Sequence, residues 1–308
     1  MIDPSLKPYL DRWKDAWKAL PADASVQARR DMLERLSDQA RKPLPPGMTS
    51  TVTTVPAPRS VRVRLFRPAV PGPLPAVVYM HGGGWMQGSP ETHDELAATL
   101  AQETGHLVAS VDYALAPENP FPAAIEDCAA VTRWLVAEAA ALGVDSARIS
   151  TAGDSAGANL AAALTLVFRG ATPRFRCQLL FYPPVDFAYN RPSVTENANG
   201  PIITAQSLAP VGKMYVPKAE DRLNPLAAPI LAESHAGLPP AFVAVAEHDP
   251  LRDEGRDYAA KLRAAGVEVE LDEGKSLFHG YLRAIGEAPV ARKPLERACA
   301  WLRRWSVA

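Results

Sequence analysis

The stretch RISTAGDSAGANLAAALTLVF, residues 148–168, decides the fold that we expect for this chain. It begins with a short run typical of a strand, turns through Gly153-Asp154-Ser155-Ala156-Gly157, and continues as an Ala- and Leu-rich helix. Side chains two positions before and after the serine would collide in so sharp a turn, so only glycine fits there. The pattern predicts a strained Ser155 whose hydroxyl is raised above the edge of a sheet.

The same five-residue pattern also arises by chance in Gly- and Ser-rich turns. The strand character before Ser155 and the helix character after it favour a nucleophile over a chance match, because the sharp turn requires this context. The N–H of Ala156 lies at the helix N-terminus, where we expect it to be free to donate to an oxyanion.

Composition excludes several classes of function. The 308 residues are 47% hydrophobic and 22% charged, which is typical of a soluble globular protein. The net charge of −1 gives no basic surface for nucleic acid. We find neither a secretory signal nor an apolar run long enough to anchor the chain in a membrane. The cysteines, Cys128, Cys177 and Cys299, lack metal spacing, so we expect a cytoplasmic protein with buried free thiols.

Strand and helix patterns alternate along most of the chain. We expect strands at about 50–56, 61–68, 75–80, 106–112, 148–152, 176–182, 241–247 and 267–272. We expect helices at about 92–103, 122–142 and 253–265, and a last helix that ends near Trp305. This alternation predicts a mostly parallel sheet with helices on both faces, in which chemistry gathers at the carboxyl ends of the strands.

Two segments depart from the alternation. Residues 1–45 predict two amphipathic helices, and the first carries Trp13 and Trp17 on one apolar stripe. This stripe is explained either by packing on the main body or by a lid over a pocket. Residues 186–235 are polar, Pro-rich and weakly periodic, which indicates an insertion rather than framework.

A serine hydroxyl needs a base, and the base needs an orienting carboxylate. Asp249 follows a predicted buried strand, and His279 lies in the turn after the next one. The order Ser155, Asp249, His279 is the order expected of an α/β-hydrolase sheet, so we predict these as nucleophile, orienting carboxylate and general base. Three competing residues are less favoured. His248 is adjacent to Asp249 at the end of a strand, so the two side chains should point apart and His248 should not face Ser155. Asp253 and Glu254 begin a helix, where acidic residues are common.

Three consecutive glycines form the second strong motif, His81-Gly82-Gly83-Gly84-Trp85. Without side chains, the backbone N–H groups of Gly83 and Gly84 are expected to join that of Ala156 in an oxyanion hole. We expect His81 to support this loop by hydrogen bonding rather than by proton transfer. The sequence lacks the Lys-Ser/Thr of a P-loop, the pattern of a dinucleotide site and any convincing metal spacing, so we expect no cofactor and no metal.

The walls of the substrate pocket are harder to predict. Trp85 and Phe278 flank the glycine loop and the histidine, so each is a candidate for substrate contact or for the core. Weaker candidates in the insertion, equally explained by packing, are Tyr189, Leu208, Met214 and Tyr215.

Several motifs together resemble the bacterial hormone-sensitive-lipase family of carboxylesterases, family IV. They are the glycine motif at 81–85, the DYALAPE at 112–118, the FPAA at 121–124, the serine motif Gly153, Asp154, Ser155, Ala156 and Gly157, the DPLRDEG at 249–255, and FHG at 278–280. The resemblance covers roughly residues 50–305. One departure is that the family usually has arginine, which is expected to brace the glycine loop, where this chain has Ala114.

The resemblance implies an eight-stranded α/β-hydrolase fold. Its catalytic domain would span 49–308, and a helical cap would combine residues 1–48 with the insertion at about 186–235. It implies hydrolysis of short- to medium-chain acyl esters, a small-molecule substrate, through an acyl-serine intermediate, and homodimers are frequent. An amidase or another acyl hydrolase would use the same three side chains. A non-catalytic receptor on this fold typically lacks the histidine, which is present here as His279.

Overall fold

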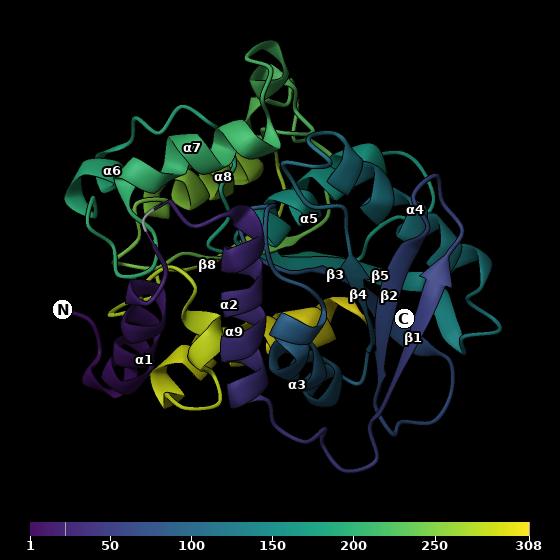
Figure 1. Cartoon of the computed structure of the whole chain (residues 1–308). Coiled ribbons are helices and arrows are strands. Elements are labelled where there is room, and N and C mark those ends of the chain that lie inside the picture. The colour runs from purple at the N-terminus through teal and green to yellow at the C-terminus, as the bar shows by residue number, and fades with distance from the viewer. Residues whose placement is uncertain (22, 308) are drawn as a thin grey trace.

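An eight-stranded sheet runs through the molecule, with helices on both faces (Figure 1). The computed structural model describes residues 1–21 and 23–307. The strand order is β1-β2-β4-β3-β5-β6-β7-β8; β2 runs antiparallel to both of its neighbours, and the other pairs are parallel. The strands are β1 (Thr49–Val55), β2 (Val61–Arg67), β3 (Leu74–Met80), β4 (Leu107–Asp112), β5 (Val144–Asp154), β6 (Gln178–Phe181), β7 (Ala241–Ala244) and β8 (Val269–Asp272). This confirms the predicted α/β fold with a mostly parallel sheet.

Two hydrophobic clusters separate the sheet from its two helical layers. One cluster packs α4 (Ala123–Ala137), α5 (Ala156–Val167) and α8 (Arg252–Ala264) on one face, drawn above the sheet in Figure 1. The other packs α3 (Asp94–Thr104) and α9 (Pro289–Trp305) on the opposite face. Burial on both faces explains why β3 and β4 read as continuous apolar runs.

Element boundaries differ from the sequence predictions where pairing or loop geometry decides them. The helix expected over 122–142 ends at Ala137, and the strand expected from Arg148 begins at Val144, where Val144 pairs with Leu74 of β3. The strand expected through Glu247 ends at Ala244 because its neighbour bends at Gly274, which has a φ of +50°. Beyond Ala244, pairing continues through isolated contacts, such as the hydrogen bond from Val245 N–H to Asp272 O and the parallel bridge between His248 and Phe278.

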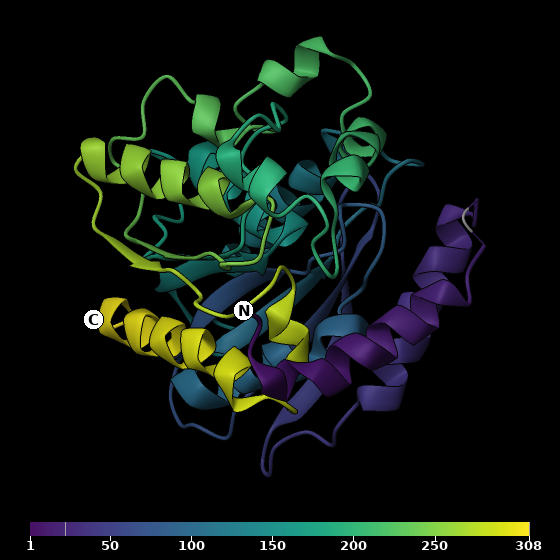
Figure 2. The same cartoon turned by 90° about the vertical axis from the view of Figure 1, so that its left-hand side faces the viewer.

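The N-terminal segment and the insertion lie toward the left of Figure 1 and nearer the viewer in Figure 2. The N-terminal segment holds the short 3₁₀ helix η1 (Pro4–Leu6), α1 (Lys7–Lys18) and α2 (Val26–Ala40). The insertion holds α6 (Pro192–Glu196), α7 (Ala205–Tyr215), η3 (Glu220–Leu223) and η4 (Pro229–Leu231). Two further 3₁₀ turns are η2 (Glu91–His93) and η5 (Tyr281–Ala284). The two amphipathic helices expected in the N-terminal segment are confirmed.

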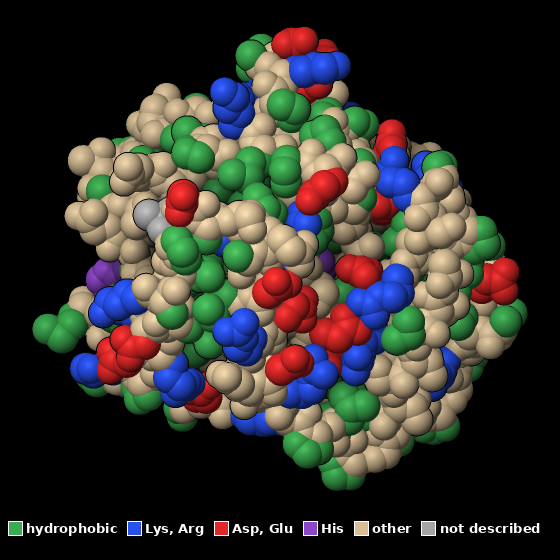
Figure 3. Space-filling view, viewed as in Figure 1, with side chains coloured by type: hydrophobic (Ala, Val, Ile, Leu, Met, Phe, Trp, Pro, Cys, Tyr) green, Lys and Arg blue, Asp and Glu red, His purple; other side chains and the backbone are tan. Residues whose placement is uncertain are grey.

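The surface carries mixed charge on the face drawn in Figure 3, where basic and acidic side chains are interspersed. None of the helices in the described ranges is both long enough and apolar enough to cross a bilayer. Cys128, Cys177 and Cys299 are free and buried, as predicted.

A buried histidine joins the start of β4 to the end of α9. His106 is 1% exposed, its Nε2 lies 2.7 Å from Ser306 Oγ, and its Nδ1 lies 3.1 Å from the Thr104 carbonyl oxygen. Burial lowers the pKa of His106 to about 4. An unperturbed histidine titrates near ~6.5, so below that pH the unfolded chain binds more protons than the folded chain. The stabilising contribution of His106 is therefore complete above about pH 6.5 and decreases as the pH falls toward about 4.

We predict that His106→Gln makes the melting temperature less sensitive to acid. The wild-type melting temperature should fall more between about pH 7 and pH 5 than that of the variant, because glutamine takes up no proton on unfolding. Thermal unfolding followed by circular dichroism at several pH values measures the difference. Parallel curves for the two proteins would contradict the assignment.

Candidate active site

Ser155 occupies the turn between β5 and α5 in a backbone conformation that few residues adopt. Its φ is +51° and its ψ is −123°, and its N–H donates to the Phe181 carbonyl oxygen at 2.8 Å. A Cβ at Gly153 would lie 2.3 Å from backbone atoms of Gly157, and one at Gly157 would lie 2.0 Å from the Met80 oxygen. A side chain at either glycine would therefore collide with the backbone, as expected from the sequence, and at Gly157 the collision would be with the end of β3.

The loops after β7 and β8 bring a carboxylate and an imidazole together. A parallel bridge pairs His248 with Phe278, so the following residues, Asp249 and His279, also lie side by side. Nδ1 of His279 lies 2.7 Å from Asp249 Oδ2, and Nε2 of His279 lies 2.8 Å from Ser155 Oγ. Because a carboxylate only accepts, the proton lies on Nδ1, and the lone pair on Nε2 faces the serine hydroxyl.

Asp249 is fully buried and well supplied with donors. Its Oδ1 accepts the N–H of Leu251 at 2.8 Å, just before α8, and its backbone oxygen accepts from Asn197 of the insertion at 3.2 Å. The competing acidic residues are engaged elsewhere. Asp253 accepts the N–H of Ser193, and Glu254 accepts that of Val185, each at 2.9 Å. The loop geometry thus leaves Asp249 as the carboxylate that faces the imidazole.

The glycine loop turns in conformations that a side chain would strain. Gly83 has a φ of +138° and Gly84 a φ of +63°, and a Cβ at Gly83 would lie 2.0 Å from the Gln87 oxygen. Gly82 donates its N–H to Asp154 Oδ1 at 2.9 Å. The N–H groups of Gly83, Gly84 and Ala156 donate to no acceptor in the part of the chain that the structure describes. These three donors are therefore available to a ligand.

Asp154, next to the serine, is buried among polar groups that the sequence did not indicate. Tyr79 donates to its Oδ1 at 2.6 Å, Tyr182 donates to its Oδ2 at 3.3 Å, and His93 Nε2 lies 3.4 Å from Oδ1. Burial opposes the charged carboxylate, yet His93, Arg283 and the hydroxyl of Tyr79 outweigh burial and lower the pKa of Asp154. The side chain is thus an anion that links β3, β5 and the glycine loop.

His81 lies beneath the glycine loop as a neutral support. Its ring stacks on Tyr113 at 4.3 Å, its Nδ1 lies 3.0 Å from the Gly82 oxygen, and Tyr113 donates to its backbone oxygen at 2.7 Å. Burial, followed by the charge of His93, lowers the pKa of His81 to about 3. A histidine held neutral in this way fits the supporting role expected from the sequence.

An arginine from the N-terminal segment holds the glycine loop against the segment that contains Ala114. Arg30 of α2 donates to the backbone oxygen of Met86 at 2.7 Å and to that of Ala116 at 2.9 Å. Its guanidinium also forms a two-point contact with Glu118, at 2.7 and 2.9 Å. Ala114 itself donates its N–H to Asp127 Oδ2 at 2.9 Å. Arg30 thus braces the loop although position 114 carries no arginine.

A cavity of about 530 Å³ opens at Ser155 and His279. The N-terminal helices supply Trp13 and Trp17 to its wall, and the insertion supplies Ile202, Ile203, Ser207 and Val211. Of the six predicted wall residues, Trp85, Tyr189 and Leu208 line the cavity.

The other three predicted wall residues require correction. Phe278 is buried and stacks near Tyr9, with ring centroids 6.1 Å apart, because the bridge to His248 turns it into the core. Tyr215 is buried behind Trp85, with ring centroids 4.5 Å apart, and Met214 packs against the same core. None of the three lines the cavity in the structure as described.

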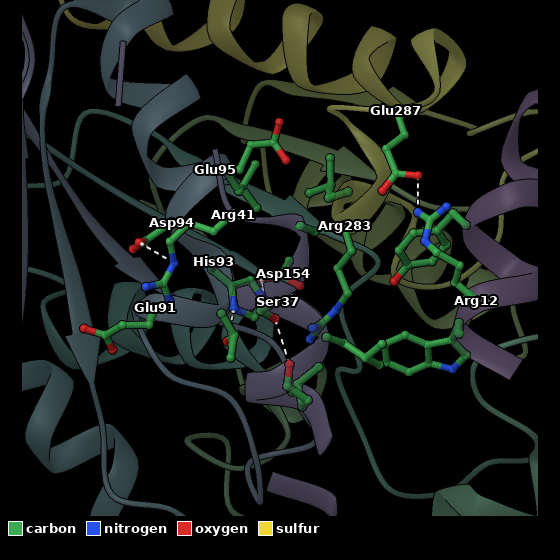
Figure 4. A pocket seen from close by; sticks show the side chains of 18 residues that line it. Arg12, Ser37, Arg41, Glu91, His93, Asp94, Glu95, Asp154, Arg283 and Glu287 are labelled. Atoms are coloured by element: carbon green, nitrogen blue, oxygen red, sulfur yellow. Dashed lines mark hydrogen bonds and ion pairs between the residues drawn. The ribbon is translucent and has the colours of Figure 1, made fainter. Parts of the chain in front are cut away.

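A smaller cavity of about 90 Å³ lies on the other side of Asp154 (Figure 4). His93 and Arg283 line it, and Arg283 and Asp154 line both cavities. Residues 1–21 and 23–307 contain no group of three His, Cys, Asp or Glu side chains that could hold a metal ion.

Comparisons with known proteins agree on one family. A family model described as the alpha/beta hydrolase fold matches residues 77–283. Carboxylesterase NlhH of Mycobacterium tuberculosis is 39% identical over 98% of this chain and 96% of its own. Ethyl acetate hydrolase of Pseudomonas putida is 36% identical over 92% of each chain. A solved hyperthermophilic esterase from the archaeon Pyrobaculum calidifontis matches with a TM-score of 0.90 and 36% identity, covering 100% of this chain and 99% of the other. The chain therefore belongs to the alpha/beta hydrolase fold family, in its hormone-sensitive-lipase-like group, and is a carboxylic ester hydrolase.

Proposed function

We propose that this enzyme cleaves short- to medium-chain acyl esters through an acyl-serine intermediate. Ser155 is the nucleophile, His279 the general base and then acid, and Asp249 the carboxylate that fixes the tautomer of His279. The observation that carries the proposal is the continuous contact from Asp249 to Ser155 through His279, with heavy-atom distances of 2.7 and 2.8 Å. These distances are within the range for proton transfer between a nucleophile and its base.

The proposed reaction has two halves. Ser155 Oγ attacks the ester carbonyl carbon while His279 Nε2 takes the hydroxyl proton. The carbonyl oxygen becomes an oxyanion and accepts from the N–H groups of Gly83, Gly84 and Ala156. His279 then gives its proton to the departing alcohol, leaving an acyl group on Ser155. In the second half His279 takes a proton from water, the water oxygen attacks the acyl carbon, and the acid is released as the serine hydroxyl is restored.

The cavity and its two covering segments support small acyl groups as substrates. A volume of about 530 Å³ lies within the usual range for small-molecule sites, and a relative is named for hydrolysis of ethyl acetate, a short acyl ester. We propose that residues 1–48 and the insertion at about 186–235 form a cap, because both contribute side chains to the cavity wall. A non-catalytic receptor is disfavoured by the imidazole that contacts Ser155.

We predict that Ser155→Ala lowers turnover of 4-nitrophenyl butyrate by at least about a thousandfold, and that Asp249→Asn lowers it by about 10⁴-fold.

A fluorophosphonate should label Ser155 stoichiometrically in the wild type, and peptide mass spectrometry would locate the labelled residue. A panel of esters graded by acyl length, with one amide analogue, then separates an esterase from an amidase. Labelling of another residue with full loss of activity would reject Ser155 as the nucleophile.

Arg30 provides a second prediction, because it holds the loop that carries two of the proposed oxyanion donors. Loss of one such donor typically lowers turnover about 10²- to 10³-fold, so displacement of the loop in Arg30→Met should lower kcat within that limit. KM should change less, since the hydrogen bonds from the loop N–H groups to the substrate oxygen strengthen in the transition state. Arg30→Lys should restore part of kcat. Arg35→Met, on the exposed face of the same helix, is the matched control.

If Arg30→Met lost activity only in proportion to its loss of folded protein, with kcat per active site unchanged, this positioning role would be contradicted. Active-site titration with a fluorophosphonate separates the two results, because it counts only functional serines.

The cap proposal predicts a change in acyl-length preference. Leu208 of α7 is buried at the cavity wall, so Leu208→Trp should fill part of the space available to an acyl chain. We expect kcat/KM for 4-nitrophenyl octanoate to fall about tenfold more than that for the acetate, from loss of apolar contacts worth about 1–3 kcal/mol. Leu223→Trp, at a position 72% exposed in the same insertion, is the control. Equal losses for both esters would place Leu208 outside the acyl path.

A further inference from the structure

Arg283 places an unpaired cation in the wall of the active-site cavity. It lies on η5, four positions after His279 in the chain, and lines the cavity together with His279 and Ser155. Its guanidinium carbon lies 5.8 Å from the centre of the Trp13 ring. With the residues that the structure describes, Arg283 forms neither a hydrogen bond nor an ion pair. Figure 4 shows its side chain reaching between His93 and the Arg12–Glu287 pair.

The neighbouring cations on the smaller cavity differ in this respect. Arg12 pairs with Glu287, and Arg41 pairs with Asp38 at 2.7 Å and with Asp94 at 3.6 Å. Arg283 therefore differs from Arg12 and Arg41, the other two arginines that line the smaller cavity. The half-buried guanidinium contacts the Trp13 ring but has no hydrogen-bonding or ion-pair partner among the described residues, so it has lost part of its hydration with little compensation.

The charges around the large cavity are also unbalanced. Lys14, Lys18 and Arg29 line it together with Arg283, and Lys18 has only a 3.9 Å contact with Asp15. Among the described residues that line the cavity, Asp154 is the only acidic side chain, and it is already engaged by Tyr79 and Gly82. A cavity with walls of one sign attracts ligands of the opposite charge.

We propose that Arg283 determines specificity for esters that carry a carboxylate at the end remote from the scissile bond, such as half-esters of dicarboxylic acids. This inference rests on the proposed function, because the carboxylate-bearing ester would be cleaved by the same serine. A planar guanidinium matches a carboxylate with two parallel hydrogen bonds, and partial exclusion of water strengthens them. The lysines and Arg29 at the rim draw such a substrate toward the site.

A different role for Arg283 is compensation of the buried charge on Asp154. Arg283 is among the charges that lower the pKa of Asp154, after burial and His93, which oppose and favour the charged form respectively. If this were its whole role, replacing Arg283 would disturb the serine turn itself. Neutral and anionic esters would then lose activity to the same extent, which makes the two roles distinguishable.

The test compares esters that differ only in the remote group. Monoethyl succinate, glutarate and adipate each pair with the ethyl ester of the monoacid in which a methyl group replaces the carboxylate, namely ethyl butanoate, pentanoate and hexanoate. Proton release in a pH-stat gives kcat and KM for every ester without a chromogenic group. The proteins are the wild type, Arg283→Gln, Arg283→Lys and, as a paired cation outside the large cavity, Arg12→Gln.

We expect the ratio of kcat/KM for the matched half-ester to that for the neutral ester to fall at least about tenfold in Arg283→Gln, since hydrogen bonds to charged groups contribute at least that much. The change should lie mainly in KM, because the contact is present before and during the reaction. Arg283→Lys should retain part of the ratio, Arg12→Gln should retain all of it, and added salt should lower it in the wild type.

An unchanged ratio in Arg283→Gln for all three chain lengths would overturn the inference while leaving the proposed function intact. Equal loss for both members of each pair would assign Arg283 to support of Asp154 instead. Failure of the wild type to hydrolyse the neutral ethyl esters and 4-nitrophenyl butyrate would count against the proposed function itself.

Discussion

The carboxylate of Asp154 is the interaction on which the candidate site depends. It lies at the end of β5, accepts from Tyr79 of β3 and from Gly82 of the glycine loop, and precedes Ser155 directly. Taking this charge out of water is costly unless its donors stay in place. The donors therefore hold the glycine loop and the serine turn in one relative position. The steric contact between Gly157 and the end of β3 imposes the same position independently.

The N-terminal segment takes part in this arrangement although it lies outside the sheet. Arg30 of α2 holds the loop from the solvent side, whereas Asp154 and His81 hold it from below. Trp13 and Trp17 of α1 line the large cavity on the same side. A movement of the N-terminal helices would thus alter both the cavity wall and the support of the loop. The cavity wall and the support of the proposed oxyanion donors are consequently linked through one segment.

Much of the fold and the central contacts of the site could be predicted because their signals are local in sequence. Glycines around a serine specify a sharp turn wherever it occurs, and alternating strand and helix patterns place Asp249 and His279 at the ends of adjacent strands. Arg30 gave no such signal, because arginines on an amphipathic helix are common and its partners lie far along the chain. His93 gave no signal either, because Asp154, the carboxylate beside it, lies 61 positions away in the sequence.

The errors in the pocket wall have a related cause. Phe278 precedes His279 in the sequence, yet adjacent residues on an extended segment point to opposite sides. The bridge between His248 and Phe278 turns Asp249 and His279 toward the serine, so Phe278 must point into the core. A correct assignment required the pairing register of two loops, which no single segment encodes.

Electrostatics connect the serine turn with the rest of the cavity. Asp154 is an anion, the carboxylate of Asp249 accepts the Nδ1–H of His279, and the proposed intermediate would add an oxyanion nearby. Negative charges gathered in a partly dry site raise each other's energy unless cations lie nearby. Arg283, shared by both cavities and near Trp13, is placed to offset this accumulation. Arg283 forms no ion pair with a described residue and lines both cavities, so its charge can act on the serine turn and, under the proposal, on a bound substrate. A ligand carboxylate that paired with Arg283 would therefore weaken the stabilisation that Arg283 gives to the charge of Asp154. Because binding and stabilisation of the turn change together, only matched neutral and anionic esters separate the two effects.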